Sequence, residues 1–129
     1  NSFQYLPFPV QKALYYVRTH FKEPIGLDDV SQFVGFSSNY MSKIFRDSLG
    51  TGFKEYLTNL RLDYAEQLLR LSDESVTDIA FGCGFNSLSH FLHIFSKRYK
   101  ISPLQFRKKD MAGEGGREKP WADIKNTCG

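Results

Sequence analysis

Polar side chains that could read nucleic-acid bases recur at helical spacing in two parts of the chain. The first set is Asn39, Ser42 and Lys43, and the second is Ser89 and His93. Lysine can donate hydrogen bonds to guanine O6 and N7, and asparagine can pair with adenine N6 and N7. Such residues on the outward face of a helix are typical of base reading in the DNA major groove. On one helix alone they are equally typical of a solvated surface.

Apolar residues alternate with both sets at helical spacing. We expect the inward faces to consist of Tyr40, Met41, Ile44 and Phe45 in the first segment and of His90, Phe91, Ile94 and Phe95 in the second. Leu92 is an apolar residue on the outward stripe of the second segment. It could contact a thymine methyl group, or it could mark a segment that reads bases weakly, and we favour the second interpretation.

Both segments belong to an internal repeat. Sliding the chain by 49 residues places Gly35 on Gly84, and one extra residue in the second copy then places Ser37 on Ser87 at an offset of 50. Each copy reads as a short helix, a turn that contains glycine and a helix capped by serine. This order is the helix-turn-helix pattern, whose second helix can enter the major groove. Because the pattern occurs twice with matched caps and stripes, base reading is favoured over a merely solvated surface.

Helical periodicity, caps and chain breakers predict seven helices, and strict alternation of polar and apolar residues never persists. The fold class is therefore predicted to be all-α. The helices are expected at about 10–21, 27–34, 38–48, 52–70, 76–82, 88–99 and 103–109. Ser37 and Ser87 are predicted N-caps, Ser75 and Asp78 a capping box, and Pro103 suits a first helical turn.

The predicted helices group into two helix-turn-helix subdomains, at 10–50 and 71–109, joined by a long linker helix at 51–70. The linker is expected to separate the two reading helices by about one turn of DNA, roughly 34 Å. Residues 1–9 form a lead-in. Glycine enrichment from residue 110 onward predicts a flexible tail at 110–129 that could dock through Trp121.

Length and composition exclude several classes of protein. The 129 residues suffice for one domain or two very small ones, and 41% hydrophobic residues exclude a disordered chain. No apolar run reaches the roughly 18 residues that a membrane span needs. Two cysteines are too few for a disulfide scaffold, which favours a reducing compartment. Because the chain opens at Asn1 rather than Met, we expect it to be a piece of a longer protein.

The net charge of +3 is concentrated in one part of the chain. Residues 85–109 contain no acid and six cations, namely Lys97, Arg98, Lys100, Arg107, Lys108 and Lys109. These cations are expected to face phosphate, with solubilising charge as the alternative. Arg61 lies instead among the apolar positions of the long helix, so we interpret it as a structural residue that braces the two halves.

Metal binding and catalysis have little support. His90 and His93 share a helix face and Cys83 lies in the preceding turn, but zinc needs three or four ligands and no carboxylate has matching spacing. The sequence contains no nucleophile elbow, phosphate-binding loop or paired-carboxylate motif. We therefore expect no metal, no cofactor and no enzymatic activity.

Several short motifs together resemble the AraC/XylS regulators over about residues 10–108. They are Gly35–Phe36–Ser37, Tyr40–Met41–Ser42–Lys43–Ile44–Phe45, Arg61–Leu62 with Ala65 and Leu68–Leu69, Ile79–Ala80, Gly84–Phe85, Phe91 with Phe95, and Ser102–Pro103 with Phe106–Arg107. The resemblance implies the DNA-binding domain of a bacterial transcription regulator that binds duplex promoter DNA. A cytoplasmic, nucleoid-associated location and a sensor or dimerisation domain before Asn1 are expected with it.

The resemblance also implies roles for single residues. It places Asn39, Ser42, Lys43, Ser89 and His93 at base-reading positions, and Ser37, Arg46, Ser87, Lys97 and Arg98 at phosphate-contacting positions. Three residues depart from the family pattern. Lys100 replaces a usual Gly, so its turn could differ, His93 replaces a common Arg, and Leu92 replaces a polar residue.

A protein-interaction module is the alternative function. In that case the helical repeat would dock a partner such as RNA polymerase or a sensor domain. DNA binding requires a polar and basic outward stripe, whereas a partner-binding face would expose a contiguous apolar patch. Leu88 and Leu92 are the only sequence hints of such a patch, and the two roles could coexist.

Overall fold

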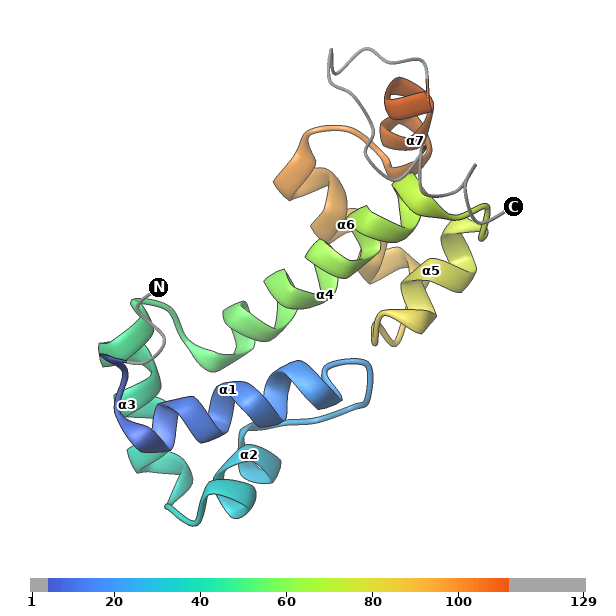
Figure 1. The fold of residues 1–129 in the computed structure, drawn as a ribbon. Coiled ribbons are helices and arrows are strands. Elements are labelled where there is room, and N and C mark those ends of the chain that lie inside the picture. The colour runs from blue at the N-terminus through green and yellow to red at the C-terminus, as the bar shows by residue number, and fades with distance from the viewer. Residues whose placement is uncertain (1–4, 112–129) are drawn as a thin grey trace, which may run out of the picture. The chain divides into compact units, whose positions relative to one another are not determined.

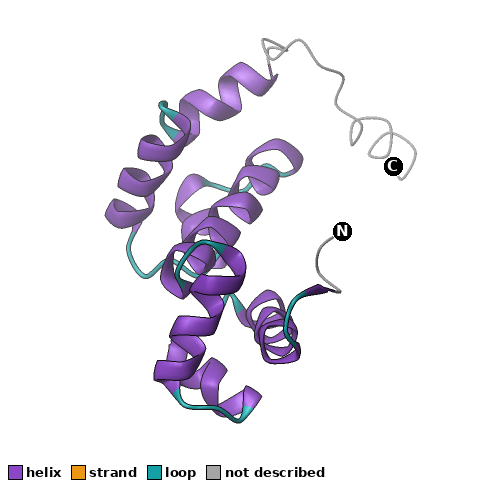
Figure 2. Cartoon of the chain, turned by 90° about the vertical axis from the view of Figure 1, so that its left-hand side faces the viewer, coloured by secondary structure: helices purple, strands orange, loops and turns teal. Residues whose placement is uncertain are grey.

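A computed structural model describes residues 5–111, which form seven helices and no strand (Figures 1 and 2). The helices are α1 Phe8–His20, α2 Leu27–Val34, α3 Ser38–Leu49, α4 Phe53–Leu71, α5 Val76–Gly82, α6 Leu88–Tyr99 and α7 Pro103–Met111. The predicted all-α fold is thus confirmed for this part of the chain. The tail prediction for residues 112–129, with Trp121, lies outside the described residues.

The chain divides into two compact units between Asp63 and Tyr64, so α4 contributes to both. Unit 1 contains α1, α2, α3 and the first part of α4, and unit 2 contains the rest of α4 with α5, α6 and α7. Each unit therefore contains one complete helix-turn-helix pair, α2–α3 in unit 1 and α5–α6 in unit 2.

The core of unit 1 is built by helical periodicity. Residues three or four apart on each helix turn to the same side, and burial of that side stabilises the unit. The buried residues are Val10, Ala13, Leu14, Val17, Val30, Val34, Met41, Phe45 and Leu57. Phe45 lies at the junction with α4, because its ring packs edge-on against Phe53 and Tyr56, with centroids 6.0 and 5.5 Å apart.

The core of unit 2 is more aromatic. Phe95 is completely buried, and its ring contacts Phe91, Tyr99 and Phe106 at centroid distances of 5.6, 4.3 and 5.7 Å. Aromatic pairs in these tilted and stacked arrangements stabilise a core beyond the area they bury. Phe95 therefore joins α6 to α7 within the unit.

Two arginines hold the chain just beyond the end of an earlier helix. Arg61 on α4 donates from Nε to the carbonyl of Phe21 at 2.7 Å and from Nη2 to that of Glu23 at 2.8 Å. These carbonyls follow α1 and lack a partner within that helix. Burial lowers the pKa of Arg61. The structural interpretation of Arg61 agrees with these contacts, but both bonds lie within unit 1, so they do not brace the two halves.

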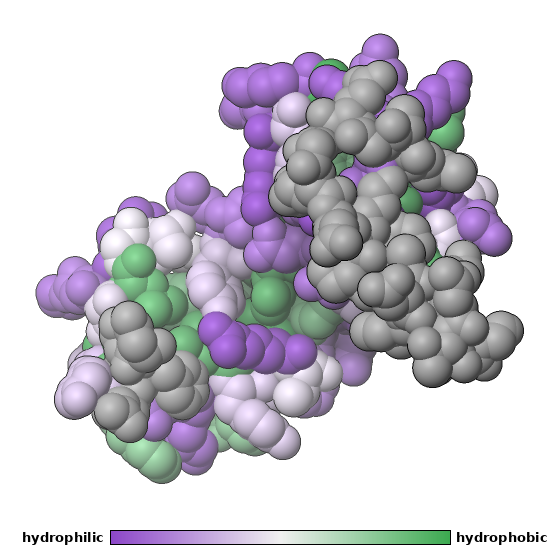
Figure 3. Space-filling view, turned by 45° about the horizontal axis from the view of Figure 1, so that its top comes forward, coloured by the Kyte–Doolittle hydropathy of each residue, from purple (hydrophilic) through white to green (hydrophobic). Residues whose placement is uncertain are grey.

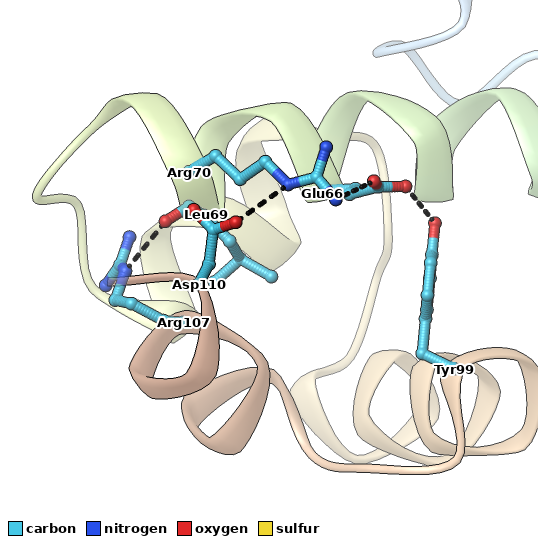
Figure 4. A network of polar contacts seen from close by, with 6 residues as sticks. All are labelled: Glu66, Leu69, Arg70, Tyr99, Arg107 and Asp110. Atoms are coloured by element: carbon cyan, nitrogen blue, oxygen red, sulfur yellow. Dashed lines mark hydrogen bonds and ion pairs between the residues drawn. The ribbon is translucent and has the colours of Figure 1, made fainter. Parts of the chain in front are cut away.

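Arg107 on α7 repeats this arrangement in unit 2. Its Nε donates to the carbonyl of Leu69 at 3.1 Å (Figure 4), and its Nη2 donates to the carbonyl of Ser72 at 3.0 Å, just beyond the end of α4. Glu66 accepts a hydrogen bond from the Tyr99 hydroxyl at 2.9 Å and pairs with Arg70 at 2.9 Å. These contacts tie α4 to α6 and α7.

Some helix ends differ by one or two residues from those that the sequence periodicity predicts. α1 begins at Phe8, two residues earlier than predicted, because Pro9 is tolerated in a first helical turn. α7 continues to Met111, two residues beyond the predicted end. Within the described residues, none of the helices has the length and apolar character that crossing a membrane requires.

Candidate nucleic-acid interface

Serine caps set the start of both candidate recognition helices. Ser37 Oγ accepts a hydrogen bond from the Tyr40 N–H at 3.1 Å, and Ser87 Oγ accepts one from the His90 N–H at 3.0 Å. A cap of this kind satisfies an otherwise unpaired amide in the first turn. The hydroxyl proton of each serine can still be donated outward, so capping is compatible with the predicted phosphate contact. Ser75 caps α5 in the same way, through the Asp78 N–H at 3.1 Å.

The turns before these helices require glycine. Gly35 and Gly84 have φ angles of +95° and +105°, in the left-handed region that residues with a Cβ avoid. The Gly35 N–H bonds to the Ser31 carbonyl at 2.8 Å, and the Gly84 N–H bonds to that of Phe81 at 3.2 Å. The bonds that correspond in the two units run from the Phe36 N–H to the Ser31 carbonyl at 3.2 Å and from the Phe85 N–H to the Ala80 carbonyl at 3.1 Å, and the second copy has one extra residue before its helix.

The predicted base-reading residues all reach the surface. Asn39, Ser42 and Lys43 are exposed on α3, and Ser89 and His93 are exposed on α6. On each helix they lie opposite the buried pair, which is Met41 with Phe45 or Phe91 with Phe95. Leu92 is 37% exposed between Ser89 and His93, so the outward stripe of α6 contains one apolar contact point.

Two residues expected to face inward do not. Tyr40 is 43% exposed, with its ring against Phe36 at 5.1 Å between centroids, and His90 is exposed with its ring 6.0 Å from Phe85. Each precedes the first buried residue of its helix by one position. A rotation of about 100° per residue moves such a side chain to the edge of the apolar face.

Lys43 has a partner on its own helix that the sequence reasoning missed. Its Nζ lies 2.8 Å from Asp47 Oδ2, one turn further along α3, and the two side chains are 77% and 60% exposed. The hydrogen bond and the charge of Asp47 raise the pKa of Lys43, so the ammonium stays protonated. The i, i+4 spacing on the outward stripe is the signal that could have identified Asp47.

Arg46 lies against the connection from α3 to α4. A Cβ added at Gly52 would come within 2.7 Å of Arg46 Nη2, so the guanidinium occupies the space that a side chain at position 52 would need. The Arg46 side chain is exposed and keeps this position at the C-terminal end of α3. A planar guanidinium there can bind a phosphate through two donors.

The predicted cationic end of unit 2 contains one structural cation. Five of the six cations are exposed, namely Lys97, Arg98, Lys100, Lys108 and Lys109. The guanidinium of Arg98 lies 5.0 Å from the Tyr99 ring centroid. Arg107 instead donates to the carbonyls of Leu69 and Ser72 at the end of α4, a structural contact that the sequence did not predict. The packing of α7 on α4 explains this contact, because only the tertiary fold brings these carbonyls close to Arg107.

Lys100 keeps the turn that glycine forms in unit 1. Its φ of 72° and ψ of 4° match those of Gly50, at 76° and 3°, and each residue's N–H bonds to the carbonyl four residues earlier at 2.8 Å. The expectation of a different turn is therefore wrong. The bond from the Lys100 N–H to the Ser96 carbonyl closes the turn, and Lys100 adopts it at the cost of left-handed strain.

Replacing Lys100 with Gly is expected to stabilise the protein by about 1 kcal/mol, because glycine adopts a left-handed conformation without strain. The free energy of unfolding, measured by urea denaturation, would report this change. Lys97→Gly is a matched control, since it introduces glycine inside α6 and should destabilise by about 1 kcal/mol. If Lys100→Gly were as destabilising as the control, the strain at position 100 would be refuted.

The residues considered for a metal site do not form one. Cys83 is fully buried in unit 2, whereas His90 and His93 are exposed on α6. Among residues 5–111, no three histidine, cysteine or acidic side chains lie together in a way that could hold a metal ion. The arrangement instead offers hydrogen-bond donors, acceptors and cations on the exposed sides of α3 and α6.

Comparison with known proteins identifies the family. A family model described as a helix-turn-helix domain matches residues 30–109. An uncharacterized helix-turn-helix transcriptional regulator from Staphylococcus aureus is 37% identical over 98 residues. The match covers 76% of this chain but only 13% of that regulator, so the chain spans about an eighth of the length of such relatives.

Solved structures agree with this assignment. A transcriptional regulator from Chromobacterium violaceum, described as an AraC-type DNA-binding-domain protein, is 31% identical with a TM-score of 0.73. That likeness covers 78% of this chain and 90% of the other. The DNA-binding domain of AdpA, solved in complex with a target DNA, is 25% identical with a TM-score of 0.75, over 84% and 96% of the two chains. The chain therefore belongs to the AraC/XylS-type family of helix-turn-helix domains.

Proposed function

We propose that this chain is the sequence-specific, duplex DNA-binding domain of a bacterial transcription regulator. The observation that carries the proposal is the repeated, serine-capped helix with an exposed polar stripe, α3 in unit 1 and α6 in unit 2. The AdpA domain of similar fold was solved with its target DNA, which supports the same ligand class here. The regulator would act in the cytoplasm, at the nucleoid, and without an enzymatic step.

In this proposal each recognition helix enters a major-groove segment, and the two segments are adjacent on the duplex. Asn39, Ser42 and Lys43 would contact bases from α3, and Ser89 and His93 from α6. Phosphates would be held by Ser37, Arg46, Ser87, Lys97 and Arg98. In the proposal the two helix-turn-helix subdomains are residues 10–50 and 71–109, and residues 51–70 are the linker helix. Because one chain carries two reading helices, a monomer could bind a site that is not palindromic.

A mobility-shift titration with genomic and unrelated duplexes tests the function directly. We expect a shift with both at low salt and a preference for particular genomic fragments as salt rises, because base contacts add to a common phosphate term. No shift with any duplex at about 50 mM salt would overturn the proposal, since phosphate contacts are strongest there.

Base contacts and phosphate contacts can be separated by a pair of alanine variants. Lys43→Ala should cost about 1–3 kcal/mol on a preferred duplex and relax the base preference. Lys97→Ala should weaken binding to all duplexes alike and flatten the dependence of log affinity on log salt by about one. Affinities for preferred and random duplexes at several salt concentrations provide the measurement. Equal losses for both variants on random DNA would contradict the assignment of Lys43 to a base.

An exposed aromatic face on unit 1 favours a second, protein-binding role beside DNA binding. Tyr15 on α1 and Phe33 on α2 are exposed with ring centroids 6.4 Å apart, and Lys12 Nζ lies 5.5 Å from the Phe33 centroid. Hydrophobic side chains also reach the surface of unit 1 in Figure 3. RNA polymerase or a sensor domain is the proposed partner. A further mobility shift when purified polymerase is added to the DNA complex is expected, and its absence argues against the polymerase.

A further inference from the structure

Asp47 places a carboxylate on the face of α3 that carries the predicted base readers. Asn39, Lys43 and Asp47 follow one another at intervals of four residues, so they form one outward row. We infer that Asp47 is a specificity-determining residue. It holds the Lys43 ammonium in a position to bond guanine, and it prevents the ammonium from binding the phosphates of unrelated DNA. This inference rests on the proposed function.

A contribution to the stability of α3 does not explain why residue 47 is an aspartate. α3 ends at Leu49, so the acid lies in the last turn, where the helix dipole favours cations. The order of the pair, with lysine before the acid, is also the less favourable one along a helix. Both side chains are well exposed, and exposed pairs of this kind contribute little to folding. The acid therefore opposes the local helix electrostatics.

The second copy of the repeat shows that the fold does not require an acid there. At the offset of 50 residues, Asp47 corresponds to Lys97 and Lys43 corresponds to His93. α6 forms the same serine-capped helix as α3, with a cation in this position of its last turn. The acid is therefore a property of α3 and its surface rather than of the helix-turn-helix pair.

The chemistry of the pair explains how it could sharpen base reading. A lysine ammonium has three N–H donors and no acceptor. One donor bonds to Asp47 Oδ2 at 2.8 Å, which leaves two for guanine O6 and N7. On unrelated DNA the carboxylate repels phosphates and neutralises the lysine charge. The pair thus lowers affinity where no guanine is in reach and maintains it where guanine is.

The test compares Asp47→Asn with the wild-type 129-residue chain on two duplexes of about 30 base pairs, roughly three helical turns. One duplex is selected by the wild-type chain from a randomised pool, and the other is unrelated to it. Removal of the carboxylate should tighten binding to the unrelated duplex about fivefold, since it frees one exposed charge. The salt slope on that duplex should steepen by about one, because Lys43 then neutralises one more phosphate. Affinity for the selected duplex should change by less than about twofold, because Lys43 already bonds guanine there.

Two further variants separate this effect from simple charge removal. Asp73→Asn removes an exposed acid in the connection between α4 and α5 and should leave the salt slope unchanged. In a Lys43→Met background, Asp47→Asn should also leave the slope unchanged, since no lysine is released. If Asp47→Asn acts like Asp73→Asn on both duplexes, the inference is overturned while the proposed function stands. If the wild-type chain itself shows no salt-dependent binding, the proposed function fails instead.

Discussion

Raising the salt concentration from 50 to 200 mM is expected to weaken DNA binding about a thousandfold, if the chain neutralises about six phosphates. Each contact releases condensed counterions, so the logarithm of the affinity falls linearly with the logarithm of the salt concentration, with a slope near −5 for about six contacts. In the proposal this charge would come from exposed cations near the ends of the two recognition helices, among them Arg46 and Lys97. Fluorescence anisotropy with a labelled duplex would measure the slope.

Lys12 provides a matched control for the salt dependence. Lys12 lies on α1 rather than on a recognition helix, and its ammonium lies over the rings of Phe8 and Phe33, at 5.9 and 5.5 Å from their centroids. Lys12→Ala should therefore keep the slope, whereas Lys97→Ala should flatten it by about one. An affinity that does not depend on salt would contradict phosphate binding altogether.

The second large effect is on folding. Phe95→Ala should lower the free energy of unfolding by about 3–5 kcal/mol, because it removes a fully buried ring and leaves a cavity. Typical domains are stable by only about 5–15 kcal/mol, so this loss would remove a large share of the stability of the fold that holds α6. Urea denaturation followed by circular dichroism would measure the loss, and the contribution of α6 to DNA binding should disappear with it.

Two companion substitutions keep this prediction testable even if the alanine variant does not fold. Phe95→Leu retains part of the packing and should cost less than Phe95→Ala. Leu104→Ala removes a side chain that is 59% exposed on α7 and should change stability by no more than about 0.5 kcal/mol. A Phe95→Ala cost as small as that of Leu104→Ala would show that the ring cluster does not stabilise unit 2.

The features that could be predicted from the sequence are those set by neighbouring residues. Ser37 and Ser87 are followed by apolar residues at intervals of three and four, and this local pattern predicts both the cap and the buried face. Local φ, ψ preferences and periodicity depend on few residues, so the seven helices and their order follow. The internal repeat adds the pairing of helices, because matched copies must form matched structures.

The features that sequence reasoning missed depend on contacts between distant segments or on the edge of a helix face. Arg107 bonds to carbonyls 35 and 38 residues away, and only the packing of α7 on α4 brings them together. Tyr40 is aromatic like many core residues, but it lies at the edge of the apolar face of α3 and is exposed. The turn at Lys100 follows a backbone hydrogen bond to Ser96 rather than the preference of the residue.

The place of α4 in both units has a consequence for exchanging parts between related proteins. A fragment that ended in the connection at 50–52 would lack two residues of α4 that unit 1 needs. Leu57 is part of its buried core, and Arg61 bonds to the carbonyl of Phe21 after the end of α1. A fragment that began at 72–75 would lack Leu69, whose side chain is buried and whose carbonyl accepts from Arg107. The loops are therefore poor joints. A chimera is best joined inside the helix, between Asp63 and Tyr64, where each half keeps the turns of α4 that its own fold uses.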